Sequence, residues 1–241
     1  MSRSVIVTGG ASGMGAACAR LFAAAGDRVV IVDRDQAGAE ASAAAVAGRA
    51  IVGDVSDSTF CDRVVRETGQ VDVLINAAGT IHRADADGTD DDAWNRVMSV
   101  NVGGTFFLCR AALRVMKAQR SGAIVNFGSI WGEVGGRGHV AYCASKGAIH
   151  QLTRALALDH ARDGIRVNGV CPGEVDTPML RSERNAPVSD EFLAELAEQS
   201  VPMGRLAHPD EIARVVLFLA SDAASYMTGA LVPVDAGYTA I

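Results

Sequence analysis

Seven short apolar runs, rich in valine and isoleucine, recur along the chain, and most are followed by glycine, aspartate or asparagine. Apolar runs of this length between turn residues are typical of strands that are buried on both faces of a parallel sheet. The expected strands cover residues 4–8, 28–32, 49–53, 71–75, 122–127, 165–170 and 231–234.

The stretches between these runs are longer, and many are rich in residues that favour helices, alanine above all. We expect helices over residues 16–25, 36–47, 94–117, 190–199 and 209–220, together with one that carries Tyr142. Because strands and helices alternate without a repeat or a linker, residues 1–241 are predicted to form one α/β domain around a parallel sheet. A polar stretch at about residues 178–205 interrupts the alternation and is a candidate lid at the carboxyl edge of the sheet.

Composition and charge narrow the classes of partner. The net charge is −6 and no basic run is present, which argues against nucleic acid as the main partner. No apolar stretch reaches the length of a membrane span or a signal peptide, so we expect no membrane partner and a cytoplasmic location. The five cysteines are dispersed, which suits free thiols, and the acidic segment 85–92 lacks the spacing of a metal site, so no metal is expected.

A glycine-rich turn of the form G-x-x-x-G-x-G joins the first expected strand to the first expected helix. Such a turn lets the backbone approach a pyrophosphate, and the helix N-terminus offers unpaired N–H groups and the positive end of its dipole. The spacing differs from the G-x-G-x-x-G fingerprint, and a plain tight turn is the alternative. The residues that would bind a dinucleotide here are Gly9, Ser12, Gly13, Met14 and Gly15.

Carboxylates follow the second and third expected strands. Asp33 lies twenty residues after Gly13, where a carboxylate binds the 2′-hydroxyl of the adenosine ribose and repels a 2′-phosphate. This position favours NAD over NADP, although Arg34 could hold the phosphate and Asp33 could instead cap the next helix. Asp54, followed by Val55, could meet the adenine amino group or cap a helix.

Small residues follow the fourth expected strand, where a flat ligand could lie against the backbone. These residues are Asn76, Ala77, Ala78 and Gly79. Further along, Asn101 lies inside the expected helix at 94–117, where asparagine is unfavourable. If buried, Asn101 would need hydrogen-bond partners, and the alternative is an exposed or locally bonded side chain.

Ser129, Tyr142 and Lys146 form a candidate catalytic set after the fifth expected strand. On a helix, a spacing of four places Tyr142 and Lys146 on one face. An ammonium beside the phenol would lower its pKa from about 10, and the phenol could then exchange a proton with a substrate hydroxyl that Ser129 also binds. The alternative is a tyrosine that packs on a lysine stem, and Cys143 is favoured as a small packing residue over a nucleophile.

Taken together, these motifs make the whole chain resemble the short-chain dehydrogenase/reductase family. Residues 8–15 look like its T-G-x-x-x-G-x-G cofactor turn, and residues 76–79 are similar to its N-N-A-G motif, with Ala77 in place of the second asparagine. Ala236 replaces a glycine of the usual D-G-G near the C-terminus. The residues that match its catalytic tetrad are Asn101, Ser129, Tyr142 and Lys146. The residues in its nicotinamide-lining stretch are Pro172, Gly173, Val175 and Thr177.

The resemblance implies a three-layer Rossmann fold with a doubly wound seven-stranded parallel sheet, a nicotinamide cofactor, and a homotetramer or dimer. It also implies that Tyr142 is the acid–base group and that Tyr142 and Lys146 contact the cofactor. In this mechanism Lys146 lowers the pKa of Tyr142 and binds the nicotinamide ribose. Ser129 positions the substrate oxygen, and Asn101, through its backbone and a water, links Lys146 to solvent.

The expected pocket wall suggests the substrate class. Its residues are polar or cationic, which favours a small polar secondary alcohol such as a polyol, a sugar or a hydroxy acid, unless these side chains face water. The expected wall residues are His82, Arg83, Trp131, Glu133, Arg137, His139, Arg181, Glu183 and Arg184. The alternative activity is that of a 3-oxoacyl-(acyl carrier protein)-type ketoreductase, which Asp33 disfavours because such enzymes usually prefer NADPH. A cofactor-binding regulator without catalysis is a further alternative, and the intact catalytic set argues against it.

Overall fold

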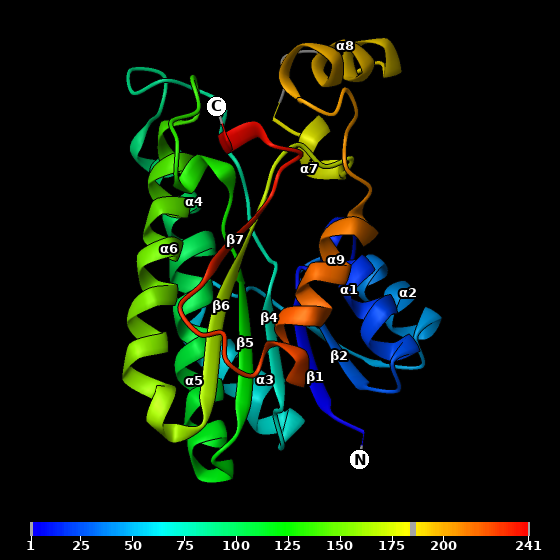
Figure 1. Ribbon diagram of the computed structural model, residues 1–241, viewed down its shortest axis with the longest axis vertical. Coiled ribbons are helices and arrows are strands. Elements are labelled where there is room, and N and C mark those ends of the chain that lie inside the picture. The colour runs from blue at the N-terminus through cyan, green and yellow to red at the C-terminus, as the bar shows by residue number, and fades with distance from the viewer. Residues whose placement is uncertain (1, 184–186, 241) are drawn as a thin grey trace.

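The computed structural model describes residues 2–183 and 187–240, and it contains one parallel sheet covered by helices on both faces (Figure 1). In these residues the sheet has seven strands in the order β3-β2-β1-β4-β5-β6-β7. Their bounds are β1 Ser4–Thr8, β2 Arg28–Asp33, β3 Arg49–Val52, β4 Val73–Asn76, β5 Gly122–Phe127, β6 Ile165–Pro172 and β7 Leu231–Val234. The single-domain, doubly wound Rossmann fold is therefore confirmed.

The two helical layers follow from the alternation of side chains along each strand. Val5 and Val7 of β1 pack against one layer, while Ile6 packs against the other, and every residue of β1 is buried. The first layer consists of α1 Gly13–Ala24, α2 Gln36–Ala45 and α9 Pro209–Leu219. The second consists of α3 Ser58–Thr68, α5 Thr105–Gln119 and α6 Val140–His160. These layers appear on opposite sides of the sheet in Figure 1.

The long helix expected at 94–117 is present, but it is not α-helical throughout. The structure has α4 Asp91–Met98, then a π-helical segment η1 Ser99–Gly104, and then α5. The π-helical segment contains Asn101, whose side chain bonds to groups outside the helix. A Cβ atom on Gly104 would lie 2.7 Å from Val55 Cγ2, so this segment also packs closely against the loop after β3. Widened turns of this kind are frequent at functional sites.

The remaining differences concern element ends and one unassigned helix. Helix α3 was absent from the expected pattern, and it begins after Asp57, whose carboxylate accepts a hydrogen bond from the Thr59 N–H. Strand β4 begins at Val73 instead of residue 71, and β6 extends to Pro172. The shorter elements are η2 Ile130–Gly132, η3 Ala161–Asp163, α7 Pro178–Arg181, α8 Asp190–Ser200, η4 Asp222–Ala224 and η5 Tyr238–Ala240.

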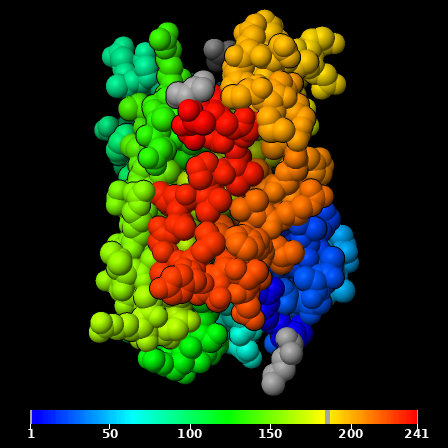
Figure 2. All heavy atoms as spheres, in the orientation of Figure 1, coloured from blue at the N-terminus to red at the C-terminus, as the bar shows by residue number. Residues whose placement is uncertain are grey.

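The strand order reverses between β1 and β4, and the carboxyl ends of the strands lie at the top of Figure 1. In open α/β sheets, ligands bind outside the carboxyl ends at such a switch point. Helices α7 and α8 lie beyond this edge, where the lid was expected at about 178–205; residues 184–186 of that range lie outside the described residues. Figure 2 shows the C-terminal segment, in red, on the surface that faces the viewer, where it runs up toward α8.

Candidate active site

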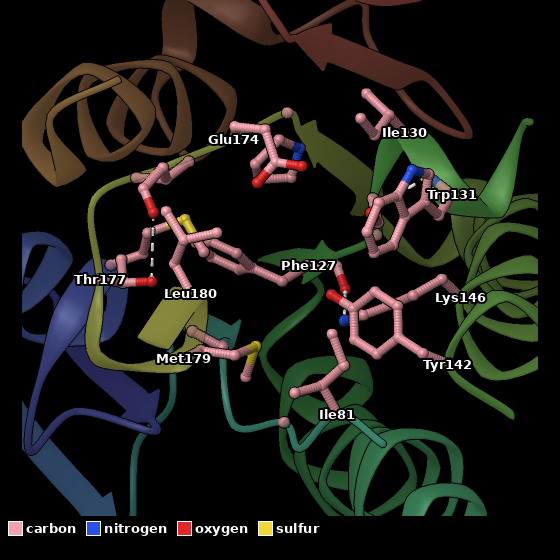
Figure 3. A pocket seen from close by; sticks show the side chains of 18 of the residues that line it. Ile81, Phe127, Ile130, Trp131, Tyr142, Lys146, Glu174, Thr177, Met179 and Leu180 are labelled. Atoms are coloured by element: carbon pink, nitrogen blue, oxygen red, sulfur yellow. Dashed lines mark hydrogen bonds between the residues drawn. The ribbon is translucent and has the colours of Figure 1, made fainter. Parts of the chain in front are cut away.

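A cavity of about 710 Å³ opens at the carboxyl edge of the sheet, where the loops after β4, β5 and β6 meet α7 (Figure 3). Ser129, Tyr142 and Lys146 all line this cavity, so the structure brings together three of the four residues expected to be catalytic. Within the described residues, the lining is otherwise mainly apolar, and its only further charged members are Arg83 and Glu174.

Tyr142 and Lys146 lie one turn apart on α6, as their spacing predicted. The Lys146 Nζ atom lies 5.4 Å from the centre of the Tyr142 ring and donates a hydrogen bond of 2.7 Å to the carbonyl of Phe127, the last residue of β5. Trp131 meets the Tyr142 ring edge-on at 6.1 Å. The buried lysine is therefore anchored to the sheet, close beside the phenol.

The acid–base properties differ from the expectation. Burial raises the pKa of Tyr142 to about 12, although a hydrogen bond with Ser129 acts in the opposite direction. Burial also lowers the pKa of Lys146 to about 8, because the ammonium loses its hydration. The expected lowering of the Tyr142 pKa is thus wrong for the protein alone, since desolvation of the phenolate outweighs the stabilising contacts.

Ser129 lies on a turn that wraps around His150. A Cβ atom on Gly128 or on Gly132 would lie 2.6 Å from the His150 ring, so both flanking glycines leave room for the imidazole. His150 Nε2 lies 3.3 Å from Cys171 Sγ, and burial lowers the pKa of the imidazole. A neutral histidine therefore supports the serine turn, and sequence reasoning did not find it.

Asn101 lines neither cavity, but its side chain holds the loop after β4. Its Oδ1 accepts a hydrogen bond from Thr80 N at 2.8 Å, and its Nδ2 donates to Thr80 O and to Ser145 Oγ, both at 2.9 Å. A Cβ atom on Gly79 would lie 3.3 Å from Asn101 Oδ1 and 4.0 Å from Lys146 Nζ. The fourth expected catalytic residue is therefore buried, both polar atoms of its side chain are hydrogen-bonded, and it lies close to Lys146 across Gly79.

A second cavity, of about 480 Å³, continues from the first along the switch point, and Gly79 lines both. Asp33 lies in its wall at the end of β2, and its carboxylate accepts hydrogen bonds of 3.0 Å from the N–H groups of Ala11 and Asp35. The expected cofactor residues that line this second cavity are Gly9, Asp33, Arg34, Asp54, Val55, Ala78 and Gly79. Those that line the first cavity are Met14, Ala77, Gly79, Tyr142, Lys146, Pro172, Gly173, Val175 and Thr177.

The glycine turn between β1 and α1 fits a dinucleotide. Gly9 has φ 66°, and a Cβ atom there would lie 2.8 Å from the Ala77 carbonyl. A Cβ atom on Gly15 would lie 2.1 Å from the Gly9 carbonyl. Thr8 Oγ1 accepts hydrogen bonds from the N–H groups of Ala77 and Ala78, which ties the turn to the loop after β4. Only glycine fits at these two positions. Gly9 lines the second cavity, and Met14, at the N-terminus of α1, lines the first.

Four expected cofactor residues line neither cavity: Ser12, Gly13, Gly15 and Asn76. The Asn76 amide donates to Asn126 Oδ1 at 2.9 Å and to Cys109 Sγ at 3.2 Å, so its side chain serves the interior of the sheet. Gly13 has φ 53° and packs against Thr177. These residues shape the turn and the strand ends.

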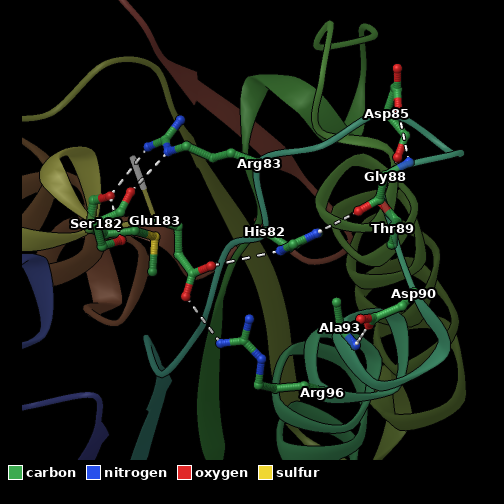
Figure 4. A network of polar contacts seen from close by, with 11 residues as sticks. His82, Arg83, Asp85, Gly88, Thr89, Asp90, Ala93, Arg96, Ser182 and Glu183 are labelled. Carbon is green, nitrogen blue, oxygen red and sulfur yellow. Dashed lines mark hydrogen bonds and ion pairs between the residues drawn. The ribbon is translucent and has the colours of Figure 1, made fainter. Parts of the chain in front are cut away.

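The expected pocket wall is largely wrong. Of its described members, only Arg83 and Trp131 line the cavity, and Arg184 lies outside the described residues. Glu183 instead pairs with Arg96 (Figure 4), and Arg181 with Asp176. Sequence reasoning missed seven lining residues: Ile81, Phe127, Gly128, Ile130, Glu174, Met179 and Leu180. Of these residues, Glu174 alone could have been expected from the sequence, because it directly follows Pro172 and Gly173, which were expected to line the cofactor site.

The described chain offers no cluster of three or more His, Cys, Asp or Glu side chains arranged to hold a metal ion. All five cysteines are free, and Cys143 is the one that is not fully buried. No helix among the described residues combines the length and the apolar character needed to cross a membrane.

Comparison with known proteins agrees with this geometry. Residues 9–239 match the family model described as "Enoyl-(Acyl carrier protein) reductase". The chain is 46% identical to galactitol 2-dehydrogenase (L-tagatose-forming) of Cereibacter sphaeroides, over 97% of this chain and 93% of that protein. The chain belongs to the short-chain dehydrogenase/reductase family. As a member of this family it is an oxidoreductase, and the family binds a nicotinamide cofactor.

Two further similarities extend over nearly the whole chain. Cis-4-hydroxycyclohexanecarboxylate dehydrogenase of Sinomonas cyclohexanicum is 43% identical, over 99% of this chain and 97% of that protein. The crystal structure of levodione reductase superposes with a TM-score of 0.94 at 33% identity, and the match covers 99% of this chain and 98% of that one. The similarity therefore includes the loops that build both cavities.

Proposed function

We propose that the protein is an NAD-dependent dehydrogenase that interconverts a small polar secondary alcohol, of polyol, sugar or hydroxy acid type, and its ketone. The observation that carries this proposal is that two neighbouring cavities share Gly79 in their walls, one with Ser129, Tyr142 and Lys146 and the other with Asp33. The names of the relatives support an alcohol substrate. One of them acts on an uncharged polyol and another on a carboxylate-bearing alcohol, so the names leave the charge of the substrate open.

In the oxidative direction Tyr142, as phenolate, takes the proton of the substrate hydroxyl, and Ser129 Oγ holds the same oxygen. When bound, the oxidised nicotinamide would supply the hydride acceptor and a positive charge that lowers the pKa of Tyr142 from about 12. Lys146 would bind the nicotinamide ribose and stabilise the phenolate. The Asn101 carbonyl accepts a hydrogen bond from Thr105 Oγ1 at 2.8 Å, and its second lone pair would hold the water that links Lys146 to solvent.

Asp33 supports NAD over NADP. Its carboxylate is held by two backbone N–H groups at the mouth of the second cavity, where it would accept a hydrogen bond from a ribose 2′-hydroxyl and repel a 2′-phosphate. Gly9, Ser12, Gly13, Met14 and Gly15 would form the turn beneath the pyrophosphate, together with the N-terminus of α1. Asp54 and Val55 would contact the adenine.

A 3-oxoacyl-(acyl carrier protein)-type ketoreductase is the second candidate. Two observations favour it: exposed Arg34 lines the second cavity and could bind a 2′-phosphate, and the raised pKa keeps Tyr142 protonated as the donor that a reduction needs. A preference for NADPH and for ketone reduction would support this alternative.

We also propose that the protein is a cytoplasmic homotetramer or dimer. Large apolar side chains are exposed on helices α5, α6 and α9 and near the C-terminus, and a second copy of the chain would remove them from water. These side chains are Phe106 at 39% exposure, Leu158 at 82%, Phe218 at 43% and the fully exposed Tyr226. Light scattering coupled to size-exclusion chromatography measures the mass directly, and a mass near the single chain's 25.0 kDa would contradict the proposal.

The function is tested by steady-state oxidation with NAD and with NADP. We suggest 2,3-butanediol, threitol and galactitol, each paired with the hydroxy acid of equal carbon number: 3-hydroxybutyrate, threonate and galactonate. Oxidation of at least one of these alcohols, with NAD preferred over NADP by tenfold or more (about 1.4 kcal/mol), is the expected result. If wild-type protein oxidises none of them and reduces ketoacyl thioesters with NADPH, the ketoreductase alternative replaces this proposal.

A further inference from the structure

His150 fills the space beneath the turn that carries Ser129. It lies on α6, one turn after Lys146, and it is only 2% exposed. A Cβ atom on either Gly128 or Gly132 would lie 2.6 Å from the Nε2 atom of this ring. Because the ring is buried, the turn can close on it in this way only with glycine at both positions.

Cys171, near the end of β6, contacts the same ring nitrogen. Its Sγ atom lies 3.3 Å from His150 Nε2, and a Cβ atom on Gly128 would lie 3.1 Å from this sulfur. Burial lowers the pKa of His150 and raises the pKa of Cys171 to about 11, so both side chains are neutral at neutral pH. Each also forms a hydrogen bond with the Ser129 backbone. The imidazole and the thiol therefore hold the same segment of main chain.

The other nitrogen of the ring has no comparable support. Among the described residues, His150 Nδ1 is buried and has no hydrogen-bond partner. The Glu133 carboxylate lies 3.8 Å from it, and the Glu133 side chain is 63% exposed. The orientation of the ring is therefore set by its contacts on the side of the serine turn.

The Ser129 hydroxyl depends on the position of this turn. Its Oγ accepts a hydrogen bond of 3.1 Å from Trp131 N, within the turn. Burial raises the pKa of Tyr142, and a hydrogen bond with Ser129 opposes this effect. A shift of the turn would therefore move the hydroxyl relative to Tyr142 and relative to a bound substrate oxygen.

We propose that His150, together with Cys171, is a positioning residue for the Ser129 hydroxyl. The two side chains bind the main chain of the turn, and the ring occupies the space into which the turn would otherwise relax. A displacement of about 1 Å near the reacting groups can cost about 100-fold in rate. This inference rests on the proposed function, in which Ser129 holds the substrate oxygen.

The first test is His150→Leu, which keeps an apolar side chain beneath the turn and removes both ring nitrogens. We expect kcat to fall by about tenfold or more, while the Kd for NADH stays within about twofold of wild type. His150→Gln should recover part of the lost kcat, because its amide restores a hydrogen-bond donor. Gln151→Leu is the matched control, since Gln151 is exposed at the next position of α6.

Two further readouts separate this role from a general disturbance of α6. Loss of the hydrogen bond between Ser129 and Tyr142 raises the pKa of Tyr142, so the rise of kcat with pH should move to higher pH in His150→Leu, as in Ser129→Ala. When His150→Leu is combined with Ser129→Ala, kcat should fall no further than in Ser129→Ala alone. The histidine then has no hydroxyl to position, and the two changes are not additive.

Cys171→Ala is a second variant in case His150→Leu does not fold, and it should also lower kcat and move the rise of kcat to higher pH. A kcat within about twofold of wild type in both variants would overturn the inference. So would a loss of NADH affinity in His150→Leu, which would show an effect through Lys146, or a full additional loss of kcat in the double variant. These results would leave the proposed function intact. If wild-type protein oxidises no secondary alcohol, the proposed function itself fails, and this inference fails with it.

Discussion

The Asn101 side chain donates a hydrogen bond of 2.9 Å to Ser145 Oγ, and it thereby ties the π-helical segment η1 to the helix that carries Tyr142 and Lys146. Ser145 Oγ in turn donates to the Tyr142 carbonyl at 2.8 Å. Together with the two bonds to Thr80, this places one buried amide at the junction of α6, η1 and the loop after β4. The geometry of the active site therefore depends on a residue that touches no cavity.

Replacement of Asn101 by alanine should impair both stability and catalysis. The variant leaves the backbone N–H and carbonyl of Thr80 unpaired, and each such loss costs about 1–3 kcal/mol in the free energy of unfolding. Urea denaturation measures this cost, and kcat should fall as well because helix α6 loses its side-chain tie to the π-helical segment η1. Asn95→Ala is the matched control, since Asn95 is exposed on α4. Equal stability of the two variants would contradict the role assigned to Asn101.

Replacement of Tyr142 by phenylalanine should lower kcat by several orders of magnitude and leave NADH affinity almost unchanged. The change removes only the hydroxyl that transfers the proton, while the ring that Trp131 contacts remains. Steady-state kinetics and fluorescence titration of NADH measure the two quantities. Tyr226→Phe is the control, because Tyr226 is fully exposed. Activity within about tenfold of wild type, a change of about 1.4 kcal/mol, would show that Tyr142 is not the acid–base group.

Replacement of Asp33 by asparagine should weaken NADH binding and strengthen NADPH binding, so that their affinity ratio changes by about tenfold or more. The amide loses the charge that repels a 2′-phosphate, and Arg34 in the same cavity is then free of the competing carboxylate. Fluorescence titration of both reduced cofactors measures the ratio. In the control Asp35→Asn, the altered residue caps α2 at Gly38 and should leave the ratio unchanged. Tighter NADPH than NADH binding in wild-type protein would show that Arg34 outweighs Asp33.

The buried lysine makes stability depend on pH. Lys146 has a pKa of about 8 in the folded protein against 10.5 for a free side chain, so between these values the unfolded state binds more protons. Its contribution to the free energy of unfolding must therefore rise with pH across this window. Urea denaturation of wild type and Lys146→Met should show the stability difference moving in favour of wild type from pH 8 to pH 10.5. A difference that is constant or moves the other way would contradict the lowered pKa.

The strands were predictable because each strand is a continuous apolar run that ends at a turn residue, and this pattern depends on local sequence alone. The π-helical segment was not predictable, since it depends on bonds from Asn101 to Thr80 and Ser145, which lie 21 and 44 residues away. Helix α3 was missed for a related reason. Its apolar face is formed by a few spaced residues such as Phe60 and Val64, and these are buried only against α5 and the sheet.

The site was predictable where residues directly follow a strand, because parallel strands bring their carboxyl ends to one edge. Asp33, Gly79 and Ser129 are of this kind, and all three line a cavity. The charged wall was not predictable, because charged side chains find partners that sequence spacing does not reveal. Glu183, for example, pairs with Arg96, which is 87 residues away. The direction of the Tyr142 pKa also needed the structure, since burial decided it.

Ala236 occupies a left-handed backbone conformation, with φ 56°, in the turn after β7. This conformation costs an L-residue about 1–2 kcal/mol, whereas glycine adopts it readily. Part of the gain from glycine is lost to the greater freedom of the unfolded chain, about 0.4–1 kcal/mol. Ala236→Gly should therefore stabilise the protein by about 0.5–1 kcal/mol, which corresponds to a rise in Tm of roughly 2 °C for a domain of this size.

The control for this change has the opposite sign. Ala41 is exposed within α2, where φ is negative, and Ala41→Gly should destabilise the protein by about 1 kcal/mol because glycine is a poor helix former. Differential scanning calorimetry of both variants measures the two shifts in Tm. If Ala236→Gly destabilises the protein as Ala41→Gly does, the turn at Ala236 is not strained. The hydrogen bonds from Gly237 N and Thr239 N to the Asp235 carboxylate would then be sufficient to hold it.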